Sequence, residues 1–142
     1  HMVRLGIGQL LSYCRRFYDR QFDTKKVRAS ELIKQFESIL DAYLAEGSEL
    51  PRRLGPPQVA WCSSQLHLSA NYFGDVVKNE LGITAKEFIR HKITKRAIAL
   101  LVDKRLPINE VASQLGFNYP NHFTRFFRQA TGKSPSQYKN SR

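Results

Sequence analysis

The sequence has little cysteine and no long apolar run. Its two cysteines, Cys14 and Cys62, are too few to build a disulfide scaffold in a chain of 142 residues. Both fall in apolar helical patterns, where we expect small, buried side chains. No apolar run approaches the roughly 20 residues that a membrane-spanning helix needs, and no signal-peptide pattern is visible. We therefore expect neither a disulfide-stapled scaffold nor a membrane-embedded protein.

Acidic residues are also scarce. There are 12 Asp and Glu residues against 23 Lys and Arg residues, which gives a formal net charge of +11 and a pI near 10.0. Such an excess favours a polyanionic partner, which could be DNA, RNA or an anionic membrane surface. Because 42% of the residues are hydrophobic and 11% aromatic, a folded chain with one core or two small ones is expected.

Patterns for catalysis and metal binding are missing. His67, His91 and His122 have no cysteine or carboxylate at metal-ligand spacing. There is no paired nucleophile and base, and no glycine-rich loop that would cradle a phosphate. We therefore expect no enzyme, no metal and no other cofactor.

Apolar residues recur at helical spacing along the chain, and no segment alternates as a strand does. The predicted helix Gly8–Phe22 has an apolar stripe that could pack on this chain, on an absent domain or on a second copy. Leu50–Pro57 is predicted to be a loop, because three prolines and a glycine disfavour regular structure. The other predicted helices are Ser30–Glu46 before Gly47, Gln58–Leu66, Ala70–Leu81 between Ser69 and Gly82, a helix from Thr84 to about Lys104, and a short one from Ser134 to Tyr138.

The stretch Ile108–Tyr138 is typical of a helix-turn-helix. Ile108, Val111, Ala112 and Leu115 share one helical face, and Gly116 can end that helix with a positive φ. Phe117 is expected to fill the gap between the two helices, Asn118 to cap the second, and Pro120 to sit in its first turn. The second helix is predicted to bury Phe123, Phe126 or Phe127, and Ala130, and to expose Asn121, His122, Thr124, Arg125 and Arg128.

The chain contains this unit twice. Ser64-Gln65-Leu66 matches Ser113-Gln114-Leu115 at an offset of 49 positions. Beyond the turn the offset becomes 50, which places one extra residue in the second turn. At that offset the matches are Asn71 with Asn121, Phe73 with Phe123, Lys78 with Arg128, Gly82 with Gly132, and Phe88 with Tyr138.

Two such units on a stiff connecting helix can place their second helices in successive major grooves of one duplex, about 34 Å apart. Exposed amide, imidazole and guanidinium groups suit the edges of bases there. The alternative is a protein-interaction module whose helical units hold helical partners without sequence-specific DNA binding.

At these residues the chain resembles the AraC/XylS family of bacterial transcription regulators. The family pattern I-x-x-[IV]-A-x-x-[LY]-G-F is met from Ile108 to Phe117, and F-[KR]-x-x-x-G-x-S-P-x-x-[YF] from Phe127 to Tyr138. The first unit fits through Leu68-Ser69, Asn71-Tyr72-Phe73, Lys78 and Gly82. The clear resemblance covers about Pro57 to Tyr138. More weakly, Arg16–Phe22 resembles the segment that joins the two parts of relatives from Bacteroidetes-like bacteria.

The resemblance implies an all-α fold, with two helix-turn-helix subdomains joined by a long connecting helix and preceded by N-terminal amphipathic helices. It also implies an N-terminal effector or dimerisation domain that is missing here, which fits His1 and Met2 as a cloning remnant. The implied partners are double-stranded DNA and RNA polymerase, with no membrane, in the bacterial cytoplasm at the nucleoid. The expected organisation is a helical linker or dimerisation segment, 3–50, and a DNA-binding domain, 57–142, divided into 57–83, 84–106 and 107–139.

Carried over position by position, the resemblance assigns base contacts to Asn121, His122 and Arg125, with Tyr119 and Arg128 nearer the phosphates. Arginine forks onto guanine and asparagine onto adenine in the major groove. The remaining candidates are Asn71 for a base and Tyr72, Lys78, Lys95 and Arg96 for the backbone, although exposed Lys and Arg residues such as Lys92 are more often simply solvated.

The first unit departs from the family pattern at Gly74 and Asp75, where many relatives carry a long polar or basic residue. Glycine offers nothing to a base edge, and an aspartate repels phosphate and accepts only from a cytosine amine. We therefore expect this unit to read DNA mainly through shape and backbone; a subgroup rule is the alternative.

Overall fold

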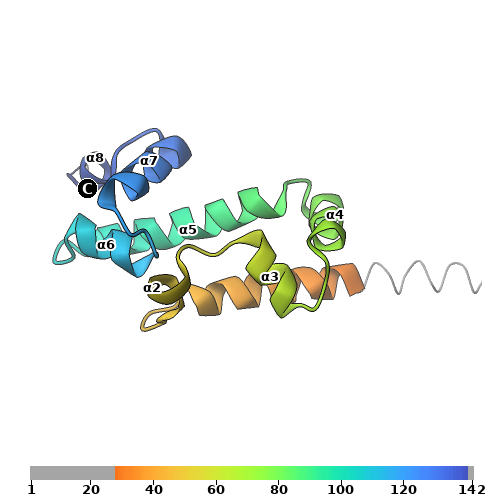
Figure 1. Ribbon diagram of the computed structural model, residues 1–142. Coiled ribbons are helices and arrows are strands. Elements are labelled where there is room, and N and C mark those ends of the chain that lie inside the picture. The colour runs from red at the N-terminus through yellow and green to blue at the C-terminus, as the bar shows by residue number, and fades with distance from the viewer. Residues whose placement is uncertain (1–27, 141–142) are drawn as a thin grey trace, which may run out of the picture.

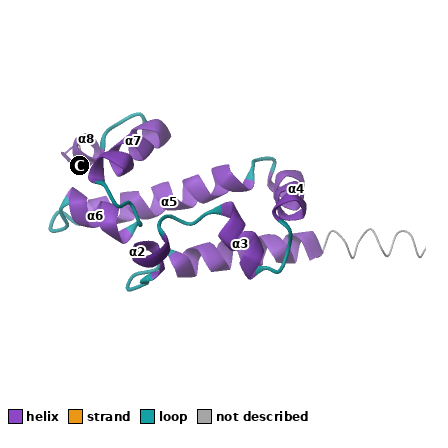
Figure 2. Ribbon diagram, in the orientation of Figure 1, coloured by secondary structure: helices purple, strands orange, loops and turns teal. Residues whose placement is uncertain are grey.

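The computed structural model describes residues 28–140, and the helix predicted over Gly8–Phe22 lies outside them together with Cys14. Figure 2 shows helices joined by loops, and residues 28–140 contain no strand, so the all-α prediction is confirmed for this part of the chain. A helix over residues 28–43 comes first. It is followed by α2 (Leu50–Leu54), α3 (Val59–Gln65), α4 (Ala70–Leu81), α5 (Ala85–Val102), α6 (Ile108–Gln114), α7 (Pro120–Thr131) and α8 (Pro135–Asn140) (Figure 1).

The helix bounds confirm the internal repeat. α3 and α6 begin and end 49 positions apart, whereas α4 and α7 begin and end 50 positions apart. Equivalent side chains fill both cores: Phe73 and Phe123 are fully buried, and so are Val77 and its counterpart in the second unit, Phe127. The extra residue therefore lies in the second turn, as predicted.

Side-chain caps begin α4, α5 and α8. The Tyr72 amide donates to Ser69 Oγ at 3.2 Å, and the Glu87 amide donates to Thr84 Oγ1 at 3.1 Å. At the position equivalent to Thr84, Ser134 Oγ accepts from the Gln137 amide at 3.2 Å. α4 and α7 both end at a left-handed glycine, a conformation that glycine adopts without a Cβ clash.

The helix over residues 28–43 packs on the first unit. The Phe36 ring lies 4.8 Å from that of Phe73 and 5.0 Å from that of Phe88, measured between centroids. Farther along the same helix, the Tyr43 ring lies 4.8 Å from that of Trp61 in an edge-to-face arrangement. Of the segment predicted as a linker over residues 3–50, the described part therefore belongs to the same hydrophobic core as α3, α4 and α5.

The prediction of a loop over Leu50–Pro57 is wrong for its first half, which forms α2. Pro51 stands in the first turn of this helix, where a missing amide hydrogen breaks no helical hydrogen bond. The following Gly55 has a φ of 88° and ends the helix. Its carbonyl oxygen accepts from the Tyr43 hydroxyl at 2.6 Å, so α2 is tied back to the first helix.

α2 also contacts the second unit. Arg52 Nη2 lies 2.6 Å from Glu110 Oε1 of α6, in an ion pair between residues 58 positions apart. The backbone at Pro51 and Gly55 lies directly against Gly116 in the turn after α6. Residues 48–57 therefore form a strap that connects the first helix to the second helix-turn-helix unit.

The connecting helix α5 separates the two helix-turn-helix units. It has 18 residues, so its length is about 27 Å at 1.5 Å per residue. Figure 1 shows α4 at one end of α5, and α6 and α8 toward the other. The helix ends at Val102, two residues before the predicted end, and Asp103 is already extended.

Candidate nucleic-acid interface

The solvent face of α7 carries the predicted base-reading residues. Phe123 and Phe127 of this helix are fully buried, whereas Asn121, His122 and Arg125 are exposed, as is Arg128. Because the buried rings lie four positions apart, they fix which side of the helix points outward.

Two predictions for the sides of α7 are wrong. Ala130 is exposed, because it lies off the stripe that Phe123 and Phe127 define. Thr124 is half-buried rather than exposed, and its hydroxyl donates to the Pro120 carbonyl oxygen one turn back, at 3.0 Å. Neither difference alters the exposure of the predicted DNA-contacting residues of α7.

The start of α7 differs from the prediction. Asn118 does not cap the helix; the N-cap is Tyr119, and no side chain of the described residues accepts a hydrogen bond there. Pro120 occupies the first turn, as predicted, and so removes one amide that would need a partner. The other backbone amides of the first turn come directly after Tyr119 in the chain, and Tyr119 is 61% exposed. The Tyr119 ring contacts the His122 ring edge-to-face, with 5.3 Å between centroids.

Phe117 precedes α7 and packs against the rings of that helix. Its ring lies 5.5 Å from that of Phe123 and 5.4 Å from that of Phe126. Phe126 is only half-buried and Phe127 is the core residue, which resolves the alternative that the sequence left open.

The equivalent face of α4 carries a weaker set of groups. Asn71, Lys78 and Asp75 are exposed, and Tyr72 is 57% exposed. Gly74 is half-buried, and a Cβ built on it would meet no atom of the described residues within 4 Å. Crowding around the backbone therefore does not require glycine at this position. The outward face of α4 carries side chains of mixed charge, whereas the outward face of α7 is basic.

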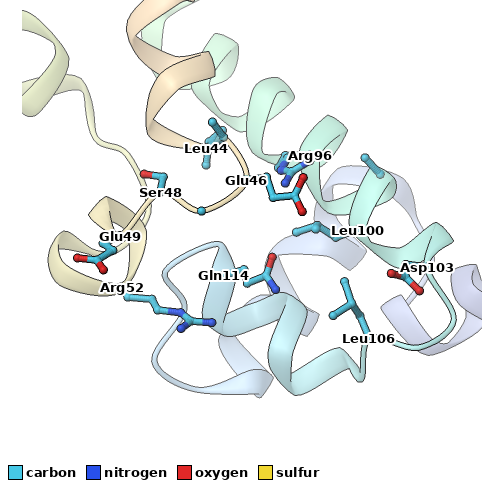
Figure 3. A pocket seen from close by; sticks show the side chains of 13 residues that line it. Leu44, Glu46, Ser48, Glu49, Arg52, Arg96, Leu100, Asp103, Leu106 and Gln114 are labelled. Carbon is cyan, nitrogen blue, oxygen red and sulfur yellow. The ribbon is translucent and has the colours of Figure 1, made fainter.

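The basic residues of α5 do not form one group. Lys92 is 15% exposed and forms ion pairs with Glu37 at 2.8 Å and Asp41 at 3.1 Å, so its charge is neutralised within the protein. Lys95 is exposed. Arg96 is half-buried and lines a cavity of about 490 Å³, which we call the acidic cavity because Glu46, Glu49 and Asp103 line it as well (Figure 3). Arg96 is therefore not brought together with the exposed groups of α7.

A second hollow lies between α5 and α7. This α5–α7 cleft has a volume of about 630 Å³, and His122 and Arg125 of α7 line it. From α5 it receives Lys86 and Arg90, which sequence reasoning did not single out. The Arg90 guanidinium lies 5.4 Å from the centroid of the Phe126 ring and donates to Gln129 Oε1 at 3.3 Å. The bond to Gln129 joins residues 39 positions apart, so no local pattern could have indicated it.

Cys62 is buried, and the described residues show no cluster of candidate metal ligands. Burial raises the pKa of Cys62 to about 12, so its thiol stays protonated at neutral pH. Within residues 28–140, no group of three or more His, Cys, Asp and Glu side chains could hold a metal ion. None of the described helices is both long and apolar enough to cross a membrane.

Comparison with known proteins agrees with this geometry. Residues 62–141 match the family described as "Helix-turn-helix domain". The HTH-type transcriptional regulator YijO of Escherichia coli K12 is 33% identical over 139 residues, which cover 96% of this chain and 45% of that protein. The chain thus spans less than half the length of this relative.

Two solved structures share the fold. A transcriptional regulator from Chromobacterium violaceum, described by its AraC-type DNA-binding domain, has a TM-score of 0.64 at 16% identity, covering 80% of this chain and 94% of that one. The DNA-binding domain of AdpA in complex with a target DNA has a TM-score of 0.62 at 19% identity, covering 78% and 90%. Because the family match spans residues 62–141, more than half of the chain, the chain belongs to the AraC-type helix-turn-helix family of DNA-binding domains.

Proposed function

We propose that this chain is the DNA-binding part of a bacterial transcription regulator, and that α4 and α7 enter successive major grooves of one duplex. The observation that carries the proposal is the face of α7, where Asn121, His122 and Arg125 stand outward over two fully buried phenylalanines. A rigid helix with polar and cationic groups on its outer face fits the major groove. The net charge of +11 supplies attraction to the phosphates.

The residues divide into two roles. Asn121, His122 and Arg125, with Asn71 in the first unit, contact base edges. Tyr119 and Arg128, with Tyr72, Lys78 and Lys95, contact the backbone, which sets the register of the protein on the duplex. Arg96 is left out of this set, because its side chain lines the acidic cavity. The first unit contacts the backbone more than the bases, because Asp75, which can accept only from a cytosine amine, stands at the position equivalent to Arg125.

The intact protein extends this function. We propose that an N-terminal effector or dimerisation domain precedes the DNA-binding part, since the chain covers 45% of its relative YijO. RNA polymerase is the proposed protein partner, and the bacterial cytoplasm, at the nucleoid, is the proposed location. No enzymatic step is part of this proposal, and the Bacteroidetes-like subgroup stays a prediction.

The test is selection of bound duplexes from a random pool, with the wild-type chain and with Arg125→Ala. We expect the wild type to enrich one sequence and the variant to lose preference at one base pair, by about 1–3 kcal/mol. Glu80→Ala, on the exposed side of α4, serves as a control that should keep the wild-type preference. An unchanged preference in Arg125→Ala would refute the reading role of α7. A wild-type chain that enriches no sequence would favour the protein-interaction module.

A further inference from the structure

The two hollows beside α5 differ in the sign of the charge around them. Lys86, Arg90 and Arg125 line the α5–α7 cleft together with His122, and no Asp or Glu of the described residues is part of its lining. The acidic cavity is lined by three carboxylates and two arginines. A cleft with charges of one sign and apolar walls concentrates the electric field and attracts counter-ions. The α5–α7 cleft therefore suits an anion.

The cleft also opens at the proposed DNA-binding surface. His122 and Arg125 belong both to its lining and to the outward face of α7. Across from them, Lys86 and Arg90 lie four positions apart on α5, so they stand one above the other on the same side of that helix. An anion held between these pairs of side chains would touch α5 and α7 together.

The two basic residues that α5 contributes to the cleft have no acidic partner among the described residues. Lys86 is exposed, and no ion pair within residues 28–140 involves it. Arg90 donates one hydrogen bond to Gln129, whereas a guanidinium carries five N–H donors. The Arg90 guanidinium also makes a cation–π contact with the Phe126 ring, at 5.4 Å from its centroid.

We propose that Lys86 and Arg90 bind the phosphate backbone of the DNA segment that lies between the two major grooves. This inference rests on the proposed function and adds a third, sequence-independent contact between the two reading helices. Lys86 forms the contact as an exposed ammonium at the mouth of the cleft. Arg90 forms it while keeping α7 in position through Phe126 and Gln129.

The experiment measures binding of the full chain to a fluorescent duplex of about 25 base pairs, long enough for two successive major grooves. One duplex carries the selected sequence and one a random sequence, and salt is varied. We expect Lys86→Ala to weaken binding to both duplexes by the same factor. The slope of log affinity against log salt should become shallower by about 0.9, the value for one phosphate contact.

Two matched variants separate this contact from net charge. Lys34→Ala removes the same charge from an exposed position on the helix over residues 28–43 and should leave the slope unchanged. Lys86→Arg keeps the charge and should bind like the wild type. Equal slopes for Lys86→Ala and the wild type, or equal losses in Lys86→Ala and Lys34→Ala, would overturn the inference. A wild-type chain that binds neither duplex would instead refute the proposed function.

Discussion

His67 and Gly116 occupy the same position in the two turns, and both have a positive φ, 59° and 93°. The first turn accepts a histidine because its surroundings leave room for a side chain, and His67 is exposed. The second turn does not. A Cβ on Gly116 would lie 2.5 Å from the carbonyl carbon of Gly55 and 2.7 Å from the Pro51 oxygen. The strap over residues 48–57 thus makes glycine necessary in one copy only.

Gly116→Ala is therefore expected to destabilise the fold more than Gly132→Ala. Gly132 also has a positive φ, but a Cβ there would meet no described atom within 4 Å. Its substitution should cost only the left-handed backbone strain, about 1–2 kcal/mol. Gly116→Ala adds a clash with backbone, which costs about 1–3 kcal/mol more. Urea unfolding followed by circular dichroism would compare the free energies of unfolding, and equal losses would show that the strap moves away easily.

Arg128→Ala is expected to weaken binding to every duplex by the same factor. Arg128 lies in the last turn of α7 and is exposed, and we assign it to phosphate. The loss of one phosphate contact should reduce the salt slope by about 0.9 while the selected sequence stays the same. Lys104→Ala, just beyond the end of α5, is the control with the same change in charge. A changed base preference in Arg128→Ala would move this residue to the reading set.

The ion pairs of Lys92 give a defined pH dependence. The hydrogen bond from Lys92 lowers the pKa of Glu37, and this stabilisation is present above the unfolded-state pKa and lost as pH falls through the folded-state value. Burial alone would lower the pKa of Lys92, but its bonds to Glu37 and Asp41 outweigh burial and raise it. This part is present below the unfolded-state pKa of Lys92 and lost as pH rises through the folded-state value.

Lys92→Met should therefore lower the free energy of unfolding at neutral pH, and by no more than about 1 kcal/mol because both carboxylates are largely exposed. The difference from the wild type should shrink as pH falls through the lowered pKa of Glu37, because protonation of this carboxylate removes its ion pair with Lys92. Lys104→Met provides the control. A difference that is constant from acid to neutral pH would show that the ion pairs of Lys92 are not its source.

Cys62 should react with thiol reagents only after unfolding. Its side chain is fully buried, and burial raises its pKa to about 12, so the reactive thiolate is scarce. In a Cys14→Ser background, labelling by iodoacetamide at about pH 8, near the pKa of an ordinary thiol, should be slow in buffer and fast in urea, as followed by mass spectrometry. Ser64→Cys with Cys62→Ser places a thiol on the exposed side of α3 and should react quickly in buffer. Rapid labelling of Cys62 in buffer would mean that the core opens locally.

Sequence periodicity located most of the helices because burial follows the helical repeat along a single element. The bounds of α4 are those predicted, since Ser69 caps its start and Gly82 ends it. The repeat predicted the relation between the two units, including the longer second turn. Composition misled at α2, because Pro51 stands in the one turn of a helix that tolerates proline.

Contacts between distant parts of the chain were beyond sequence reasoning. The pairing of Arg52 with Glu110 joins residues 58 positions apart, and nothing local in either segment indicates the other. The same holds for the place of Arg96 and for the cleft that brings Lys86 and Arg90 to α7. Periodicity could predict which residues of α7 point outward; the basic groups that surround them depend on how the helices pack.

Phe36 must be part of any fragment that keeps the core of the first unit covered. The match to the helix-turn-helix family begins at residue 62, yet the aromatic rings at the centre of the first unit, Phe73 and Phe88, are covered by Phe36 from the helix over residues 28–43. A fragment trimmed to the matched region would lay those rings bare to water and invite aggregation.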